Sequence, residues 1–153
     1  MAKQDGGGGR SRFRQLANVY LGKLYKMKRK SNKSPVAILG FDPHLSKDNV
    51  MVVRDLFNQT FALAEEIGCK IVILGGDVFT SRSAQPLEVL DAWREITEEA
   101  EARGLEIAAI PGNHDKTDPN SDRSYLSVCP GAATVVSRAS EFVWNGVSFV
   151  LIP

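Results

Sequence analysis

The chain has 153 residues, of which 43% are hydrophobic and 24% are charged, proportions that are typical of a globular protein with one hydrophobic core. Its two cysteines, Cys69 and Cys129, give neither a disulfide framework nor the spacing of a zinc site. No apolar run approaches the length of a membrane-spanning helix, and the amino terminus lacks the apolar stretch of a secretory signal. We therefore expect a cytoplasmic protein without a transmembrane segment.

The charge is unevenly distributed along the chain. Residues 1–34 contain ten basic and one acidic residue, whereas residues 35–153 contain nine basic and seventeen acidic residues. We therefore predict two parts, a basic and partly flexible extension (1–34) and a folded domain (35–153). Within the extension, apolar residues recur at helical spacing between Phe13 and Met27, which predicts a basic amphipathic helix.

The pattern of this helix leaves its role open. It could bind a phosphate backbone, dock on a partner or on its own domain, remain a solvated tail, lie on an anionic membrane surface, or serve as a targeting peptide. If it binds nucleic acid, we expect the contacts to come from its basic side chains. These are Arg12, Arg14, Lys26, Lys28, Arg29 and Lys30.

Apolar runs and helical patterns alternate along the domain. We expect strands at residues 36–41, 70–74 and 105–110, and helices at residues 49–67 and 86–103. This order predicts right-handed crossovers and a parallel sheet whose two faces are covered by helices. A short helix at 124–128, a strand at 134–136 and a hairpin across Asn145-Gly146 are expected to follow.

Polar side chains of the kinds that bind metals follow each of the three strands. Asp42 and His44 come after the first, Asp77 after the second, and the run from Asn113 to Asp115 after the third. Each residue alone also fits a turn or a cap, but the carboxyl ends of parallel strands lie along one edge of a sheet, so a shared site is expected. Carboxylate, imidazole and amide oxygen ligands suit Mn²⁺, Zn²⁺ or Fe²⁺. Two such ions favour phosphoester hydrolysis.

The order of these motifs resembles that of the calcineurin-like metallophosphoesterase superfamily, over residues 36–153. Flanking residues are similar to the DNA repair branch, meaning SbcD-type nucleases and the recombination endonuclease subunit of tailed phages. The similar segments are residues 41–45, 76–79 with Ser81 and Arg82, and 144–153. The chain differs at Thr80, where these nucleases often carry an acidic residue.

The resemblance assigns roles to the metal-type residues. It implies two divalent ions, of which Mn²⁺ is the preferred kind. Asp42 and His44 would bind the first ion, and Asp77 would bridge the first ion and the second. Asn113 would bind the second ion through its side-chain oxygen.

The resemblance also implies roles toward the substrate. His114 would be the catalytic histidine, which contacts the phosphate and protonates the leaving oxygen, and Asp115 would orient it. Arg82 could steer the substrate phosphate, although an exposed arginine after a loop is more often a solvated charge.

The family site also needs a further histidine and a Gly-His-x-His motif, whereas this chain contains only His44 and His114. We therefore expect an α/β fold, the amino-terminal half of a metallophosphoesterase β-sandwich, whose site is completed by a second segment or chain. The leading function is a DNA exo- or endonuclease subunit for recombination or repair, with a partner ATPase implied by the resemblance. The alternatives are a phosphoesterase of nucleotides or cyclic nucleotides, and a non-catalytic module that binds DNA or a partner.

Overall fold

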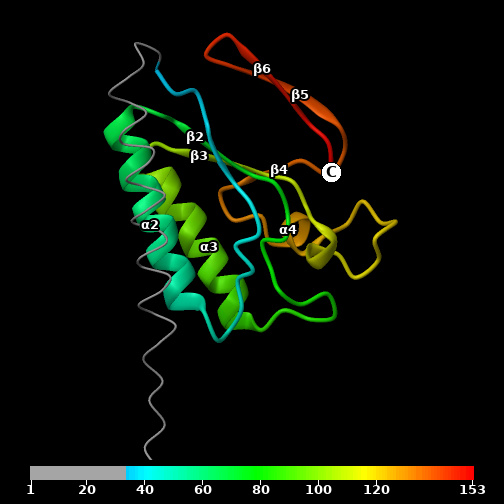
Figure 1. Cartoon of the computed structure of the whole chain (residues 1–153). Coiled ribbons are helices and arrows are strands. Elements are labelled where there is room, and N and C mark those ends of the chain that lie inside the picture. The colour runs from blue at the N-terminus through cyan, green and yellow to red at the C-terminus, as the bar shows by residue number, and fades with distance from the viewer. Residues whose placement is uncertain (1–33) are drawn as a thin grey trace, which may run out of the picture. The chain divides into compact units, whose positions relative to one another are not determined.

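The computed structural model describes residues 34–153 (Figure 1), so the predicted amphipathic helix and its basic side chains lie outside the described residues. A four-stranded parallel sheet forms the centre of the domain, in the order β1-β2-β3-β4. Its strands are β1 (Ile38–Gly40), β2 (Ile71–Leu74), β3 (Glu106–Ala109) and β4 (Thr134–Val135). The predicted parallel sheet is confirmed.

Two long helices connect the first three strands, and their ends follow from the sequence. Helix α2 (Val50–Ile67) stops at Gly68, whose left-handed φ of 72° is accessible to glycine at little cost. Helix α3 (Leu87–Ala102) begins directly after Pro86. Proline has no backbone N–H to donate to a preceding turn, so it is accommodated at the start of a helix and not in its interior. Both predicted helices are confirmed to within a residue at each end.

The prediction that helices cover both faces of the sheet is wrong. Helices α2 and α3 lie on the same face, and the hairpin of β5 (Ser140–Trp144) and β6 (Val147–Leu151) covers the other (Figure 1). The reason is the strand order. Each strand is added on the same side of the previous one, so successive right-handed crossovers place their helices on one face.

Two hydrophobic clusters fill the space above and below the sheet. On the helical face, Phe57 and Phe79 pack edge-on against the fully buried Trp93. On the opposite face, buried Ile71 and Ile73 of β2 lie beneath the hairpin, which contributes its inward-facing side chains. These are Phe142, Trp144, Phe149 and Leu151. The alternation along β2 thus buries both of its faces, which explains its continuous apolar sequence.

The remaining short elements also match the sequence. Helix α4 (Tyr125–Val128) is capped by Ser124, whose hydroxyl accepts a 3.0 Å hydrogen bond from the Ser127 amide. Asn145 and Gly146 have φ values of 47° and 74°, as a tight two-residue hairpin turn requires. Within residues 34–153, no helix has the length and apolar character that crossing a membrane requires.

Candidate metal centre

The loops after β1 and β2 run side by side and are joined by backbone hydrogen bonds. The amides of Asp42 and His44 donate to the carbonyls of Gly76 and Asp77 at 3.3 and 3.1 Å, and the amide of the next residue, Leu45, donates to the carbonyl of Val78 on the same loop at 2.7 Å. The two strands are thus continued past their ends as a pair of loops in fixed register. The side chains at their tips are held together by the backbone.

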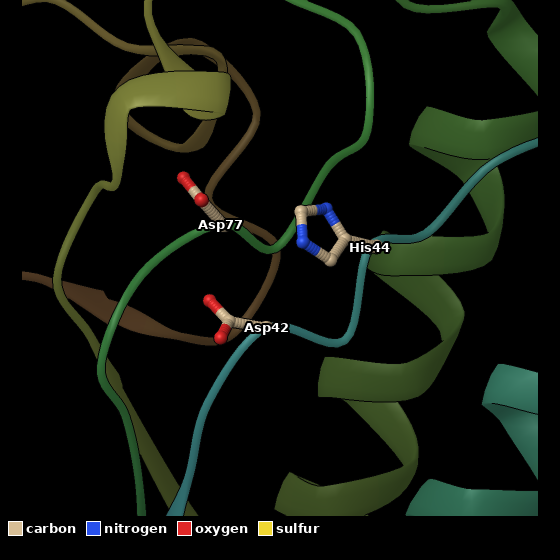
Figure 2. A group of neighbouring side chains, drawn as sticks. All are labelled: Asp42, His44 and Asp77. Carbon is tan, nitrogen blue, oxygen red and sulfur yellow. The ribbon is translucent and has the colours of Figure 1, made fainter.

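Asp42, His44 and Asp77 form a cluster at this edge of the sheet. One ligand atom from each lies within 4.8 Å of the others, with Asp42 and His44 on one loop and Asp77 on the neighbouring loop (Figure 2). Asp42 is exposed and the other two are half-buried, so the cluster opens to solvent on one side. The structure thus brings these three residues together, and their binding of a metal stays a prediction.

The backbone of all three residues is in the left-handed region. Their φ values are 52° for Asp42, 48° for His44 and 51° for Asp77, and among the described residues the only other non-glycine with positive φ is Asn145 in the hairpin turn. This conformation is sparsely populated outside glycine and costs of order 1–3 kcal/mol where it is imposed. Such residues gather at functional sites, and here the left-handed bends turn three side chains toward one another.

The cluster is of the right size and chemistry for a divalent cation. An ion with bonds of about 2.1 Å holds ligand atoms up to about 4.2 Å apart, so only a small side-chain adjustment separates this cluster from a coordination shell. Two carboxylates and an imidazole suit Mn²⁺, Zn²⁺ or Fe²⁺. A cation between the carboxylates of Asp42 and Asp77 would also offset their mutual repulsion.

The third loop carries a short 3₁₀ turn, η1 (Asn113–Asp115), that is bound to the second loop. The His114 amide donates to Asp77 Oδ1 at 2.9 Å. A side chain on Gly112 would overlap Asp77, because a Cβ built there lies 2.2 Å from Oδ1 and 2.3 Å from the Asp77 amide nitrogen. The close approach of the two loops therefore depends on a glycine at this position.

Asp115 anchors this loop. It is completely buried, and its two oxygens accept hydrogen bonds from the amides of Phe79 at 2.8 Å, Gly112 at 2.8 Å and Val78 at 3.2 Å. Burial raises the pKa of Asp115 above its usual value, and the three amides act in the opposite direction by stabilising the ionised form. The carboxylate thus joins the second and third loops through their backbones.

The ring of His114 has a different partner from the one expected. Its Nδ1 lies 2.6 Å from the backbone oxygen of Thr80, whereas Asp115 is occupied with backbone amides. A carbonyl can only accept, so Nδ1 carries the hydrogen and Nε2 remains available to a substrate. The ring also stands edge-on to His44, with 5.4 Å between ring centroids.

Sequence reasoning missed the part played by Thr80, which it noted only as a departure from the related nucleases. Besides the contact with His114, its hydroxyl donates to the backbone oxygen of His44 at 2.7 Å. Thr80 therefore touches both histidine-bearing loops. Both contacts involve a backbone carbonyl, which every residue type carries, so residue types alone could not predict them.

Asn113 and Arg82 extend the cluster. One end of the Asn113 side-chain amide lies 3.1 and 3.2 Å from the two Asp77 oxygens, and the other end meets an Nη atom of Arg82. Both ends have compatible partners when the amide nitrogen donates to Asp77 and the amide oxygen accepts from Arg82. The structure thus brings all seven metal, catalytic and substrate residues of the predicted site within these three loops, whereas the predicted nucleic-acid-binding residues of the basic extension are outside the described part of the chain.

A family model for calcineurin-like phosphoesterases matches residues 34–149, and the chain belongs to this family. No sequence among curated proteins matches significantly. A nuclease from Pseudomonas putida, MPE, is similar to this chain in structure at a TM-score of 0.46 and 22% identity, over 65% of this chain and 46% of the nuclease. A fusion protein of a xylose isomerase-like TIM barrel with 4-hydroxyphenylpyruvate dioxygenase is similar at a TM-score of 0.46 and 20% identity, over 64% of this chain and 17% of that protein.

The family is one of metal-dependent phosphoesterases. The Asp42, His44 and Asp77 cluster is a candidate site for the metal ions. The chain spans less than half of the length of either similar structure.

Proposed function

We propose that this chain is the metal-binding half of a phosphodiesterase that cleaves DNA, and that a second segment or chain supplies the remaining imidazole ligands. The observation that carries the proposal is the cluster of Asp42, His44 and Asp77, bent together by three left-handed backbone conformations. Both histidines of the sequence already lie at this site, so further imidazoles have to come from elsewhere.

The residues around the cluster have the functions that phosphodiester cleavage needs. A divalent cation bound by the cluster would act as a Lewis acid on the phosphate oxygens. His114, with Nδ1 fixed by the Thr80 carbonyl, can hold a proton on Nε2 for the leaving oxygen. Arg82 stands beside Asn113 as a cationic group for the phosphate charge.

The choice of DNA as substrate is supported by sequence. The residues that flank the metal motifs resemble the SbcD-type and tailed-phage nucleases, and residues 1–34 carry a net charge of +9. A polyanion would be repelled by the rest of the chain, which carries −8, except near bound cations. Recombination or repair, Mn²⁺ as the ion and an ATPase partner belong to the same proposal.

Metal-dependent hydrolysis by the isolated chain tests the catalytic part of this proposal. With Mn²⁺ present, we expect slow cleavage of bis(p-nitrophenyl) phosphate and of a DNA oligonucleotide, because only part of the ligand set is present. Asp42→Asn should abolish this activity. The matched control is Asp48→Asn, which makes the same charge change on the same loop, outside the cluster. Equal rates in the two variants would contradict the assigned site, and rapid turnover by the chain alone would contradict the need for a second segment.

The basic extension should supply most of the affinity for DNA. Removing residues 1–33 is expected to weaken duplex binding at least about tenfold, since each phosphate neutralised by Arg or Lys contributes about −0.9 to the slope of log affinity against log salt. Fluorescence anisotropy between about 0.05 and 0.2 M salt measures both quantities. If the shortened chain binds as tightly as the full chain, with the same slope, the extension has another role, such as docking or targeting.

A further inference from the structure

Unpaired positive charge in the domain gathers at the end of the sheet that carries the candidate metal centre. Residues 34–153 contain nine basic side chains, and five of these form ion pairs with carboxylates. The basic side chains that form no ion pair within this part of the chain are Lys70, Arg82, Lys116 and Arg123. Lys70 directly precedes β2 and so lies at the opposite end of the sheet, whereas the other three follow β2 or β3.

A hydrogen bond brings the segments of Arg82 and Lys116 together. The Thr80 carbonyl accepts from His114 Nδ1 at 2.6 Å. Arg82 follows Thr80 by two residues and Lys116 follows His114 by two residues, which is at most about 7 Å of chain in each case. Both basic residues therefore lie close to the histidine that we expect to protonate the leaving oxygen.

Helix α4 contacts the same loop through its first residue. The Tyr125 hydroxyl donates to the Arg82 carbonyl at 3.0 Å, and the Tyr125 ring packs edge-on against Phe79. Arg123 is exposed and precedes Tyr125 by two residues. The Arg82 segment thus contacts both the segment of Lys116 and that of Arg123, and these segments lie beside α4 (Figure 1).

Acidic side chains offset this positive charge only in part. In the segments 80–86 and 116–125, the acidic residues are Asp118 and Asp122, and Asp122 is paired with Arg138 at 2.7 Å. Within these two segments, one carboxylate without a basic partner therefore accompanies three basic side chains without an acidic partner. Since residues 35–153 as a whole carry −8, the two segments form a locally positive surface on an acidic domain.

We propose that Arg82, Lys116 and Arg123 form a surface that binds the phosphates flanking the scissile phosphate of a nucleic-acid strand. This inference rests on the proposed function, since it takes the scissile phosphate to lie at the candidate metal centre. It adds that the substrate is a polymer, because a cyclic nucleotide has no flanking phosphates for these side chains. Phosphate contacts fix the register and orientation of a nucleic acid without reading its sequence. The surface would thus orient the strand, whereas the basic extension supplies general affinity.

The double variant Lys116→Gln with Arg123→Gln tests this surface. It should bind a single-stranded DNA of about ten nucleotides about threefold to tenfold more weakly than the wild type, the effect of losing two exposed ion pairs. The slope of log affinity against log salt should become shallower by about 1.4, since each neutralised phosphate of a single strand contributes about 0.7. Fluorescence anisotropy of the full chain with a chelator measures both quantities. The matched control is Lys70→Gln, which removes one positive charge at the opposite end of the sheet and should leave both quantities close to their wild-type values.

A titration of the ¹⁵N-labelled full chain locates the strand without any substitution. With a chelator present, the same oligonucleotide should shift the backbone amide signals of Arg82, Lys116 and Arg123 and leave that of Lys70 in place. Inorganic phosphate at the same total phosphate concentration should shift the three signals less, because separate ions cannot contact the three side chains as one ligand.

Three results would overturn the proposal. The first is that Lys116→Gln and Arg123→Gln, measured singly, lose no more affinity for the oligonucleotide than Lys70→Gln. The second is that the oligonucleotide leaves the three amide signals in place, and the third is that inorganic phosphate shifts them equally. Hydrolysis takes no part in either measurement, so a failure of the proposed function would appear separately, as a lack of diester cleavage with Mn²⁺ by a chain that still binds the strand.

Discussion

Replacing Asp77 with asparagine should lower the affinity of the chain for Mn²⁺ by more than about 100-fold. Substituting a residue that only orients a metal ligand costs about 10- to 100-fold, and we expect Asp77 to contact the ion directly. The carboxylate lies within 4.8 Å of the ligand atoms of Asp42 and His44 and next to the Asn113 amide, and in the proposed two-ion site it would contact both ions. It also carries the formal charge that Asn lacks. Asn113→Ala, which removes one neutral ligand, should have a smaller effect.

The domain should keep its fold in this variant. Asparagine is among the few residues that tolerate a left-handed conformation, as required by the φ of 51° at this position, and its amide oxygen can still accept from the His114 amide. Calorimetry with Mn²⁺ measures the affinity. The control is Asp91→Asn on the exposed side of α3, which makes the same charge change far from the motifs in sequence. Equal affinity of the Asp77→Asn variant and the wild type would remove the basis for the bridge, whereas weak binding already in the wild type is expected from the incomplete ligand set.

Asp115→Ala should destabilise the domain by about 2–6 kcal/mol, because two buried amide groups lose their acceptor and each costs about 1–3 kcal/mol when left unpaired, whereas the third amide is only partly buried. Those amides belong to Val78, Phe79 and Gly112, so the loss falls on the junction between the second and third loops. Asp115→Asn should fall between the wild type and the alanine variant, because one of its oxygens is replaced by a donor that would face N–H groups.

Urea unfolding measures this loss as a shift of the midpoint at constant slope. The matched control is Asp118→Ala, since Asp118 also accepts from a backbone amide, that of Asn120 at 2.9 Å, but is exposed to water. Water can replace the lost acceptor there, so we expect a change below about 1 kcal/mol. If the two alanine variants lose similar stability, Asp115 is not the anchor of the third loop.

The sequence by itself determined the elements of this domain and the edge on which the site lies. The helical periodicity that ends at Gly68 located α2, and the periodicity that follows Pro86 located α3. Asn145-Gly146 located the hairpin. These signals act over a few residues, so they can be identified in the sequence. Metal-type side chains directly after three apolar strands predicted the cluster, since parallel strands end along one edge. The family match agrees with the motifs that pointed to it.

Only the tertiary structure decided how these parts act on one another. The sequential strand order, which no local pattern encodes, placed both long helices on one face and left the other to the hairpin. Likewise, Asp115 was expected beside the His114 ring, yet the ring meets the Thr80 carbonyl and the carboxylate binds three amides. Residue types indicate which side chains can bind a metal or a proton. Backbone groups are the same at almost every position, so the contacts they make depend on the packing of segments distant in sequence, and only the folded chain reveals them.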